Sequence, residues 1–177
     1  QLQPEHINFG LAIDLQKRDG SHSLIVPAIR NADAMTFAEF SAAYDEIIRK
    51  ANGNKLTPDD FVGVTVTLTN PGTIGTERSV PRLMPGQGVI VGVGSLDFPT
   101  GFSGADPRTI ADLAVAKVIT ISSTYDHRII QGAESGIFLK KVSELLLGGD
   151  EFYERVFHSI GMPYVAVQWR RDVNPVD

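Results

Sequence analysis

The chain has 177 residues and 42% hydrophobic content, which is enough for one domain with a substantial core. Its 16 Lys and Arg residues are outnumbered by 21 Asp and Glu residues, so the formal net charge is -5 and no basic surplus exists for binding nucleic acid. The absence of cysteine excludes disulfides, thiolate metal ligands and a cysteine nucleophile, so any thiol chemistry must use a thiol of the substrate.

The sequence carries no recognisable targeting segment. No apolar run approaches the roughly 20 residues that a membrane-spanning helix requires, and the first residues lack the regions of a signal peptide. We therefore expect a soluble, cytoplasmic protein with no membrane partner. Because the chain opens at Gln1 and reaches a strand-like run by Ile7, we also expect it to be a fragment of a longer polypeptide.

The first part of the chain predicts a hairpin followed by a helix. Residues 6–13 and 24–29 are strand-like and are separated by a turn-rich stretch, which indicates a β-hairpin. Thr36 and Glu39 have the spacing of a capping box, and apolar residues then recur at helical intervals. We expect this helix to end near Gly53.

The rest of the chain mixes further strands and helices. β-branched or apolar runs predict strands at residues 62–69, 88–94 and 117–125. Residues 109–116 predict a short helix, and residues 132–147 carry an apolar stripe at helical spacing. The fold class is therefore α/β, or α+β in two layers.

The composition changes after Gly149, and this change suggests a domain boundary. We expect residues 1–149 to form the main domain. Residues 150–177 contain a second amphipathic segment and then an extended stretch punctuated by proline, so we interpret them as a connector to a following domain.

His127 is the main candidate for chemistry. It lies in the polar cluster SSTYDHR at residues 122–128, where a predicted strand runs out, and an imidazole titrates near neutral pH. The alternative is a structural histidine beside an ion pair of Asp126 and Arg128, which are expected to hold the segment in place. The other histidines show no metal-ligand spacing with carboxylates, so no metal site is expected.

Several ordered blocks carry a family resemblance. Residues 125–132, YDHRIIQG, resemble the D-H-R-x-x-D-G signature of the dihydrolipoamide acyltransferases, the catalytic cores of 2-oxoacid dehydrogenase complexes. Further blocks of this family are matched at residues 7–14, 24–29, 55–58 and 67–72. The matching region covers residues 6–147, although the family core normally begins with an additional helix and strand, so the front part of the catalytic domain is expected to be missing.

The resemblance implies a chloramphenicol-acetyltransferase-like fold that forms a homotrimer. It also implies acyl transfer between a dihydrolipoamide thioester and coenzyme A, with coenzyme A and the lipoyl group as substrates. His127 matches the base that makes the attacking thiolate, and Thr69 stands where the family has a serine that stabilises the oxyanion. In this family the two residues meet across a subunit interface. The resemblance does not identify the residues that contact coenzyme A.

Two residues of this set have a second interpretation or depart from the family. Thr69 is also suited to capping the turn that follows it at Asn70-Pro71-Gly72. Gln131 stands where the family usually has aspartate and sometimes asparagine, and a neutral amide hydrogen-bonds without forming an ion pair. Gln131 therefore raises the question of how the site is organised.

A finer resemblance is carried by the variant DHRIIQG at residues 126–132, followed by residues 152–157 and 163–169. Together they look like the acyltransferase-like region of fused actinobacterial 2-oxoglutarate dehydrogenase/decarboxylases. This implies succinyl as the acyl group, lipoyl-domain proteins and other complex components as partners, and thiamine diphosphate with Mg²⁺ in a separate fused domain. The alternative function is a trimeric scaffold that positions that decarboxylase, with weak or no transfer. A serine hydrolase using Ser122 or Ser123 is set aside because no G-x-S-x-G elbow is present.

Overall fold

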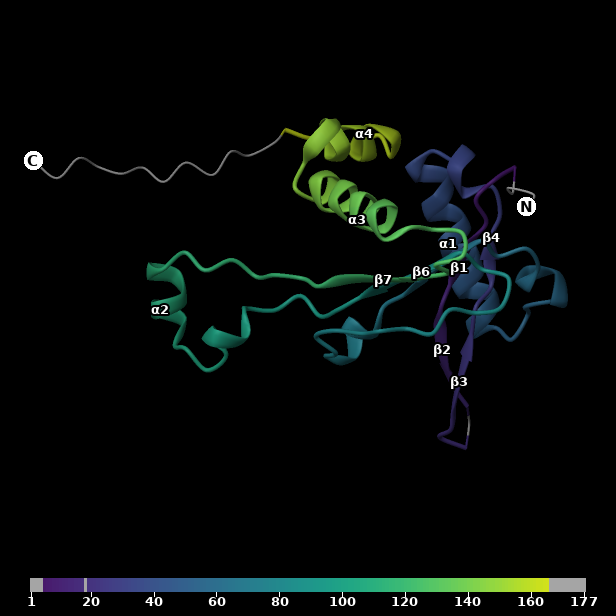
Figure 1. The fold of residues 1–177 in the computed structure, drawn as a ribbon, viewed down its shortest axis with the longest axis horizontal. Helices are drawn as coiled ribbons and strands as arrows, with labels where there is room; N and C mark the ends of the chain where they lie inside the picture. The colour runs from purple at the N-terminus through teal and green to yellow at the C-terminus, as the bar shows by residue number, and fades with distance from the viewer. Residues whose placement is uncertain (1–4, 18, 166–177) are drawn as a thin grey trace, which may run out of the picture.

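Residues 5–17 and 19–165 are described by a computed structural model that mixes strands and helices (Figure 1). The strands are β1 (Phe9–Leu11), β2 (Ile13–Gln16), β3 (His22–Ile25), β4 (Ala28–Ile29), β5 (Val66–Thr69), β6 (Val89–Val93) and β7 (Ile121–Tyr125). The α-helices are α1 (Phe37–Asn52), α2 (Pro107–Asp112), α3 (Gly132–Leu146) and α4 (Phe152–Ser159). Short 3-10 helices occupy Ala32–Ala34, Pro58–Phe61, Pro71–Ile74, Thr100–Phe102 and Gly149–Glu151.

A five-stranded mixed sheet organises the chain. Its strand order is β4-β1-β5-β6-β7, and β2 pairs with β3 in a separate two-stranded sheet. The central strands β1, β5 and β6 are mutually parallel, whereas β4 and β7 are antiparallel to their neighbours at the two edges. The α/β class predicted from the sequence is confirmed.

The predicted hairpin forms, but its ladder is divided into two parts. β1 pairs with β4 close to the main sheet, and β2 pairs with β3 where the hairpin projects away from it (Figure 1). Pro27 has no N–H to donate at the division, and its carbonyl accepts from Leu11 at 3.0 Å. The N–H of Ala12 instead donates to Leu68 of β5 at 2.9 Å, so the hairpin bonds to the main sheet at this point.

The helix α1 begins and ends as its sequence predicts. Glu39 accepts from the Thr36 N–H at 2.8 Å, and the Thr36 hydroxyl accepts from the Glu39 N–H at 3.3 Å, so the capping box is complete. The helix packs Ile47 against Leu11 and Ile29 of the sheet, which form the buried hydrophobic cluster. The predicted helix and its C-cap at Gly53 are confirmed.

Three predicted boundaries differ from the structure by a few residues. β5 begins at Val66 rather than at residue 62, because Val62 still closes the 3-10 turn that precedes it. β7 begins at Ile121, four residues later than predicted. α2 begins at Pro107 because the Asp106 carboxylate accepts from the first free N–H groups of the helix, at 3.0 and 3.1 Å.

The segment after Gly149 packs against α3. The Tyr153 hydroxyl donates to the Leu146 carbonyl at 2.7 Å, and the rings of Phe157 and Tyr164 stack with centroids 4.7 Å apart. The predicted amphipathic helix after residue 150 is confirmed as α4. The extended stretch predicted for residues 162–177 lies largely outside the described residues, and the domain boundary at residue 149 stays a prediction.

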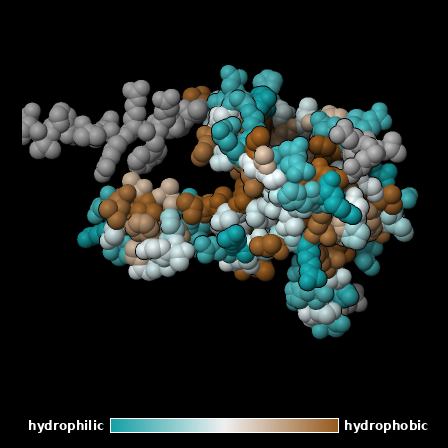
Figure 2. Space-filling model, in the orientation of Figure 1, coloured by the Kyte–Doolittle hydropathy of each residue, from teal (hydrophilic) through white to brown (hydrophobic). Residues whose placement is uncertain are grey.

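The outer end of the β6–β7 ribbon carries exposed apolar side chains. Beyond the paired strands the two chain segments extend to α2, and Figure 2 shows hydrophobic side chains gathered on this arm. Leu96, Leu113 and Val118 are 59%, 61% and 51% exposed. Among the described residues, no helix has the length and apolar character needed to cross a membrane.

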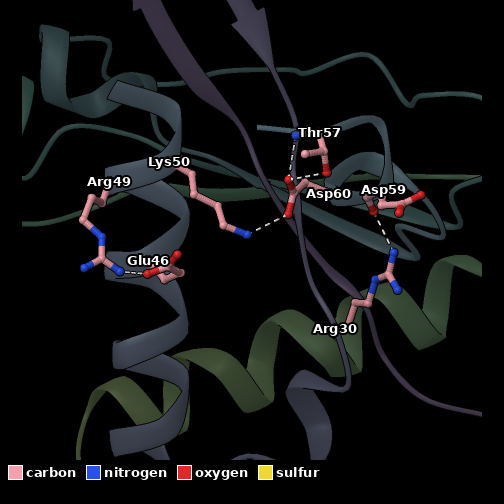
Figure 3. Close-up of polar contacts among 7 residues, drawn as sticks. All are labelled: Arg30, Glu46, Arg49, Lys50, Thr57, Asp59 and Asp60. Atoms are coloured by element: carbon pink, nitrogen blue, oxygen red, sulfur yellow. Dashed lines mark hydrogen bonds and ion pairs between the residues drawn. The ribbon is translucent and has the colours of Figure 1, made fainter. Parts of the chain in front are cut away.

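An ion pair and several hydrogen bonds join α1 to the segment that precedes β5 (Figure 3). The Lys50 ammonium lies 3.1 Å from Asp60, and Asp60 also accepts from the Thr57 N–H at 2.7 Å. The backbone N–H of Thr57 and the Lys50 ammonium hold the pKa of Asp60 below its usual value. Arg30 donates to the Asp59 carbonyl at 2.6 Å, which ties the same turn to β4.

We expect Asp60→Ala to destabilise the protein more than deletion of an exposed charge on α1. The Asp60 side chain is only 15% exposed, and its removal leaves three donors without their acceptor, the Lys50 ammonium and the N–H and hydroxyl of Thr57, which costs about 1–2 kcal/mol of unfolding free energy. The matched control is Glu46→Ala, which breaks an exposed pair with Arg49 and is expected to change stability by less than about 0.5 kcal/mol. Denaturant unfolding measures both, and equal losses would contradict the prediction.

Candidate active site

His127 lies in a tight turn between β7 and α3. The strand ends at Tyr125, and the Asp126 carbonyl accepts from the N–H groups of Ile129 and Ile130, each at 3.0 Å. His127 is exposed in the single chain, and its ring centroid lies 5.6 Å from that of Tyr125. The turn therefore presents the imidazole at the surface instead of burying it as a packing residue.

Asp126 and Arg128 fix the two sides of this turn. The Asp126 carboxylate accepts from the Arg128 guanidinium at 2.6 and 2.9 Å and from the Arg128 backbone N–H at 3.0 Å. The Asp126 N–H donates to the Gly88 carbonyl at 2.9 Å, which anchors the turn to β6. The Arg128 side chain and backbone N–H together lower the pKa of Asp126 to about 2. The pair thus holds the backbone on both sides of His127.

Gln131 stands at the N-terminus of α3, at the end of the same turn. Its backbone N–H donates to the Glu134 carboxylate at 2.6 Å, and its side chain is exposed. No hydrogen bond joins its carboxamide to His127 within the described chain. Gln131 is therefore close to His127 in the fold, and its place in a reaction stays a prediction.

Thr69 ends β5 and lines a cavity of 860 Å³. Its side chain is half-buried, and no hydrogen bond joins its hydroxyl to another described residue. The turn-capping alternative is therefore not supported, because a cap would use this hydroxyl to accept or donate within the turn at residues 70–72. The hydroxyl is available to a ligand in the cavity.

Close backbone contacts hold the loop that follows Thr69. A Cβ at Gly72 would overlap the backbone of Gly94, and a Cβ at Gly94 would overlap the carbonyl of Glu77. The Ser95 N–H also donates to the Thr76 carbonyl at 2.8 Å. Glycine is required where backbones approach so closely, so Gly72 and Gly94 allow the loop to pack against the end of β6.

The sheet register separates Thr69 from His127 within one chain. Thr69 pairs with Gly92, and Gly92 pairs with Ser122, so these three residues form one row across the sheet. β7 runs on from Ser122 to Tyr125, roughly 10 Å at strand spacing, before the turn with His127 begins. The two predicted site residues therefore lie at opposite ends of the sheet.

The remaining polar candidates have structural contacts. The Ser122 hydroxyl donates to the Ser79 carbonyl at 2.6 Å, and the hydroxyls of Ser123 and Ser135 are 2.7 Å apart. Neither serine bonds to His127 among the described residues, which agrees with setting the hydrolase aside. In residues 5–17 and 19–165, no group of three or more His, Asp or Glu side chains is arranged to hold a metal ion.

The sequence did not indicate Gln87 or Arg82, both of which line the cavity at Thr69. The Thr67 hydroxyl donates to the Gln87 side-chain oxygen at 2.6 Å, and both residues are buried. Gln87 lines the Thr69 cavity and also a hollow of 400 Å³ beside Asp126 and Arg128. Arg82 lines the Thr69 cavity as well. They belong to or flank an irregular segment whose sequence has no periodicity, so no pattern marks them.

Comparison with known proteins places this geometry in a family. A family model described as the catalytic domain of 2-oxoacid dehydrogenases acyltransferase matches residues 2–152. The chain belongs to this family. The acyltransferase family resemblance predicted from the DHR motif and its companion blocks is therefore confirmed.

Relatives of this acyltransferase domain include much longer proteins. The chain is 58% identical over 174 residues to the "Multifunctional 2-oxoglutarate metabolism enzyme" of Mycobacterium sp. (strain JLS), and 57% identical to that of Mycolicibacterium vanbaalenii. These matches cover 98% of this chain but 14% of each relative, so the chain spans about one seventh of their length. The predicted likeness to the actinobacterial 2-oxoglutarate proteins is confirmed.

Solved acyltransferase cores share the fold. Azotobacter vinelandii dihydrolipoamide acetyltransferase is 28% identical with a TM-score of 0.65, covering 82% of this chain and 55% of its own. A probable dihydrolipoamide acetyltransferase from Listeria monocytogenes is 26% identical with a TM-score of 0.66, covering 88% of this chain and 58% of its own. The predicted acyltransferase-core fold is confirmed.

The low pKa of Asp126 predicts how the turn responds to acid. The folded-state pKa of Asp126 is depressed. The contribution of the ionised Asp126 to folding stability is therefore complete above the unfolded-state pKa near 3.9, and it is lost as the pH falls through about 2. A carboxyl titration of Asp126 followed by NMR should show a midpoint near 2 in the wild type. In Arg128→Met, which removes the guanidinium, the midpoint should rise toward 3.9. A wild-type midpoint already near 3.9 would contradict the prediction.

Proposed function

We propose that this domain catalyses acyl transfer between a dihydrolipoamide thioester and coenzyme A, and that the acyl group is succinyl. The observation that carries the proposal is the turn at residues 126–128, which presents His127 on the surface within the family's DHR motif. The name of the mycobacterial relatives, a 2-oxoglutarate metabolism enzyme, supports succinyl because oxidative decarboxylation of 2-oxoglutarate yields a succinyl thioester.

In this mechanism His127 acts as the general base. A free thiol with a pKa near 8.5 is only a few per cent ionised at neutral pH, so the attacking sulfur needs a proton acceptor. A ring nitrogen of His127 takes the proton from the coenzyme A thiol, and the thiolate attacks the thioester carbonyl. When the intermediate collapses, the bond to the dihydrolipoamide sulfur breaks and that sulfur takes the proton back from the imidazolium.

Thr69 stabilises the intermediate between these two steps. The tetrahedral carbon carries a negatively charged oxygen, and a hydroxyl donor placed on that oxygen contributes about 3 kcal/mol. The Thr69 hydroxyl is free of other described partners and opens into a cavity of 860 Å³. Because the register separates the two residues within one chain, we propose that Thr69 of one copy works with His127 of a neighbouring copy in a homotrimer.

A solved relative supports the choice of residues. The structural work on the Azotobacter acetyltransferase concerns the catalytic roles of a serine, a histidine and an asparagine, the asparagine four positions after the histidine. Thr69 carries a hydroxyl like that serine, and Gln131 is an amide four positions after His127. An amide at this position is therefore compatible with a working acyltransferase, and we assign Gln131 to orienting the site by hydrogen bonding.

The proposed partners follow from the reaction. A lipoyl domain must deliver the acyl group, and other components of a 2-oxoglutarate dehydrogenase complex must generate it. The solved pyruvate dehydrogenase core is described as cubic, and it is 29% identical to this chain with a TM-score of 0.64. We assign thiamine diphosphate and Mg²⁺ to a decarboxylase domain outside this chain.

The sharing of the site between copies predicts complementation. His127→Ala should lower the rate of succinyl transfer to coenzyme A by roughly 10²- to 10⁴-fold, and Thr69→Val by roughly 10²-fold. When the two inactive variants are assembled together in equal amounts, about one quarter of the interface sites contain both wild-type residues. The mixture should therefore recover about a quarter of the wild-type rate.

The matched control is His158→Ala, which removes an exposed histidine from α4 and should leave the rate unchanged. Light scattering on each variant checks that assembly persists. Wild-type transfer by assembled His127→Ala would remove the base from the mechanism. Failure of co-assembled variants to recover activity would contradict the shared site.

Gln131→Asp should raise the transfer rate, by up to about tenfold. A carboxylate near His127 favours the imidazolium that forms during thiol deprotonation, whereas an amide supplies only a hydrogen bond. Gln131→Asn keeps the amide and is the control, expected to match the wild type. Steady-state rates at one pH with saturating coenzyme A measure the effect. A rate unchanged by Gln131→Asp would show that the amide already meets the need.

A further inference from the structure

We propose that Arg82 binds the terminal carboxylate of the acyl group and so selects succinyl over neutral chains of similar length. This inference rests on the proposed acyl transfer, and it adds a specificity-determining residue to the cavity that Thr69 lines. The evidence comes from the composition of that cavity, from the placement of Arg82 in it and from the chemistry of the guanidinium.

The cavity is mainly apolar and contains one charge. Among the described residues that line it, Arg82 is the only charged one, and the polar side chains are Thr67, Thr69 and Gln87. The other lining residues are aliphatic, aromatic, proline, methionine or glycine. A carboxylate entering such a surface loses water and needs a charged or hydrogen-bonding partner. A neutral acyl chain has no such need, so an arginine here distinguishes the two.

The segment that carries Arg82 is held on the same row of the sheet as Thr69. The Ser79 carbonyl accepts from the Ser122 hydroxyl at 2.6 Å, and Pro81 lies 3.3 Å from the position of a Cβ on Gly92. Ser122 and Gly92 are the residues that continue the row from Thr69. These contacts hold the backbone that leads into Arg82 on the row that ends at Thr69, and Arg82 and Thr69 line the same cavity.

The acyl group is short. In a succinyl thioester three carbon–carbon bonds separate the reacting carbonyl from the terminal carboxylate, roughly 4 Å when extended. A donor for the oxyanion and a cation for the carboxylate must therefore face the same cavity. Thr69 and Arg82 both line the 860 Å³ cavity from the same chain. The buried bond between Thr67 and Gln87, 2.6 Å long, fixes the polar part of its wall.

Arg82 is also available to a ligand. No hydrogen bond or ion pair joins it to another residue in the described part of the chain, whereas Arg30 and Arg128 are both held by protein oxygens. A planar guanidinium binds a carboxylate through two parallel hydrogen bonds, which gives it more geometric selectivity than an ammonium. Its role is thus substrate recognition, with no part in the proton transfer.

The test compares two acyl donors as substrates of the full-length protein. Transfer from succinyl-dihydrolipoamide and from pentanoyl-dihydrolipoamide, a neutral chain of matching length, is measured for the wild type and for Arg82→Met. We expect kcat/KM for succinyl to fall by roughly 10- to 100-fold, as for loss of a charged hydrogen-bonded pair, and that for pentanoyl to change by less than about threefold. Arg82→Lys should retain an intermediate preference for succinyl.

The control is Arg78→Met, which makes the same charge change on an exposed residue that does not line the cavity, and it should leave both donors unaffected. Equal losses with both donors, or no loss with either, would overturn the role of Arg82. If Arg82→Met fails to assemble, the same ratio of kcat/KM values is measured in Arg82→Gln, where the preference for succinyl should likewise be lost. A wild type that transfers neither acyl group would instead refute the proposed function itself.

Discussion

The direction of β7 is the constraint on which the rest of the site depends. Because β7 is antiparallel to β6, whereas β5 and β6 are parallel, the end of β7 is level with the beginning of β5, with β6 between them. Thr69 ends β5 and His127 follows β7, so the strand pairing places them at opposite ends of the sheet. In the proposed reaction, which uses both residues, two copies of the chain would have to meet, and catalysis would depend on assembly. The exposed apolar arm around α2 provides surface that such an assembly has reason to bury.

Each half of the proposed site is built rigidly within its own chain. At one end of the sheet, the Asp126 carboxylate accepts hydrogen bonds from the Arg128 guanidinium and backbone N–H. The turn that carries His127 therefore cannot change conformation without losing these bonds. At the other end of the sheet, the backbone at Gly94 packs too closely against Gly72 and Glu77 for any larger residue, and this contact holds the loop after Thr69. Preorganised groups avoid the cost of ordering at the moment of reaction. In the proposed assembly, contact between the His127 end of one copy and the Thr69 end of another would complete the site without further folding of either copy.

The sequence predicts local structure well where a few neighbouring residues determine it. The bonds between Thr36 and Glu39 form as their spacing indicates, because a capping box needs only one turn of chain. The ion pair of Asp126 and Arg128 is equally local, because both residues lie in the turn that follows Tyr125. Arg82 could not be identified beforehand, since its importance depends on Ser79 and Pro81 packing against strands distant in sequence. Contacts of this kind have no periodic signature.

Charge explains why a cation inside the cavity matters for this particular protein. The formal net charge is -5, and both proposed substrates are anionic, coenzyme A through its phosphates and the acyl donor through its carboxylate. The mean field of the chain therefore opposes binding, and attraction has to come from local positive groups. Arg82 is itself exposed, so its long-range effect is screened over about 8 Å at physiological ionic strength. In the proposed site, its preference for a succinyl over a neutral acyl chain therefore rests on direct, two-point hydrogen bonding to the carboxylate at close range.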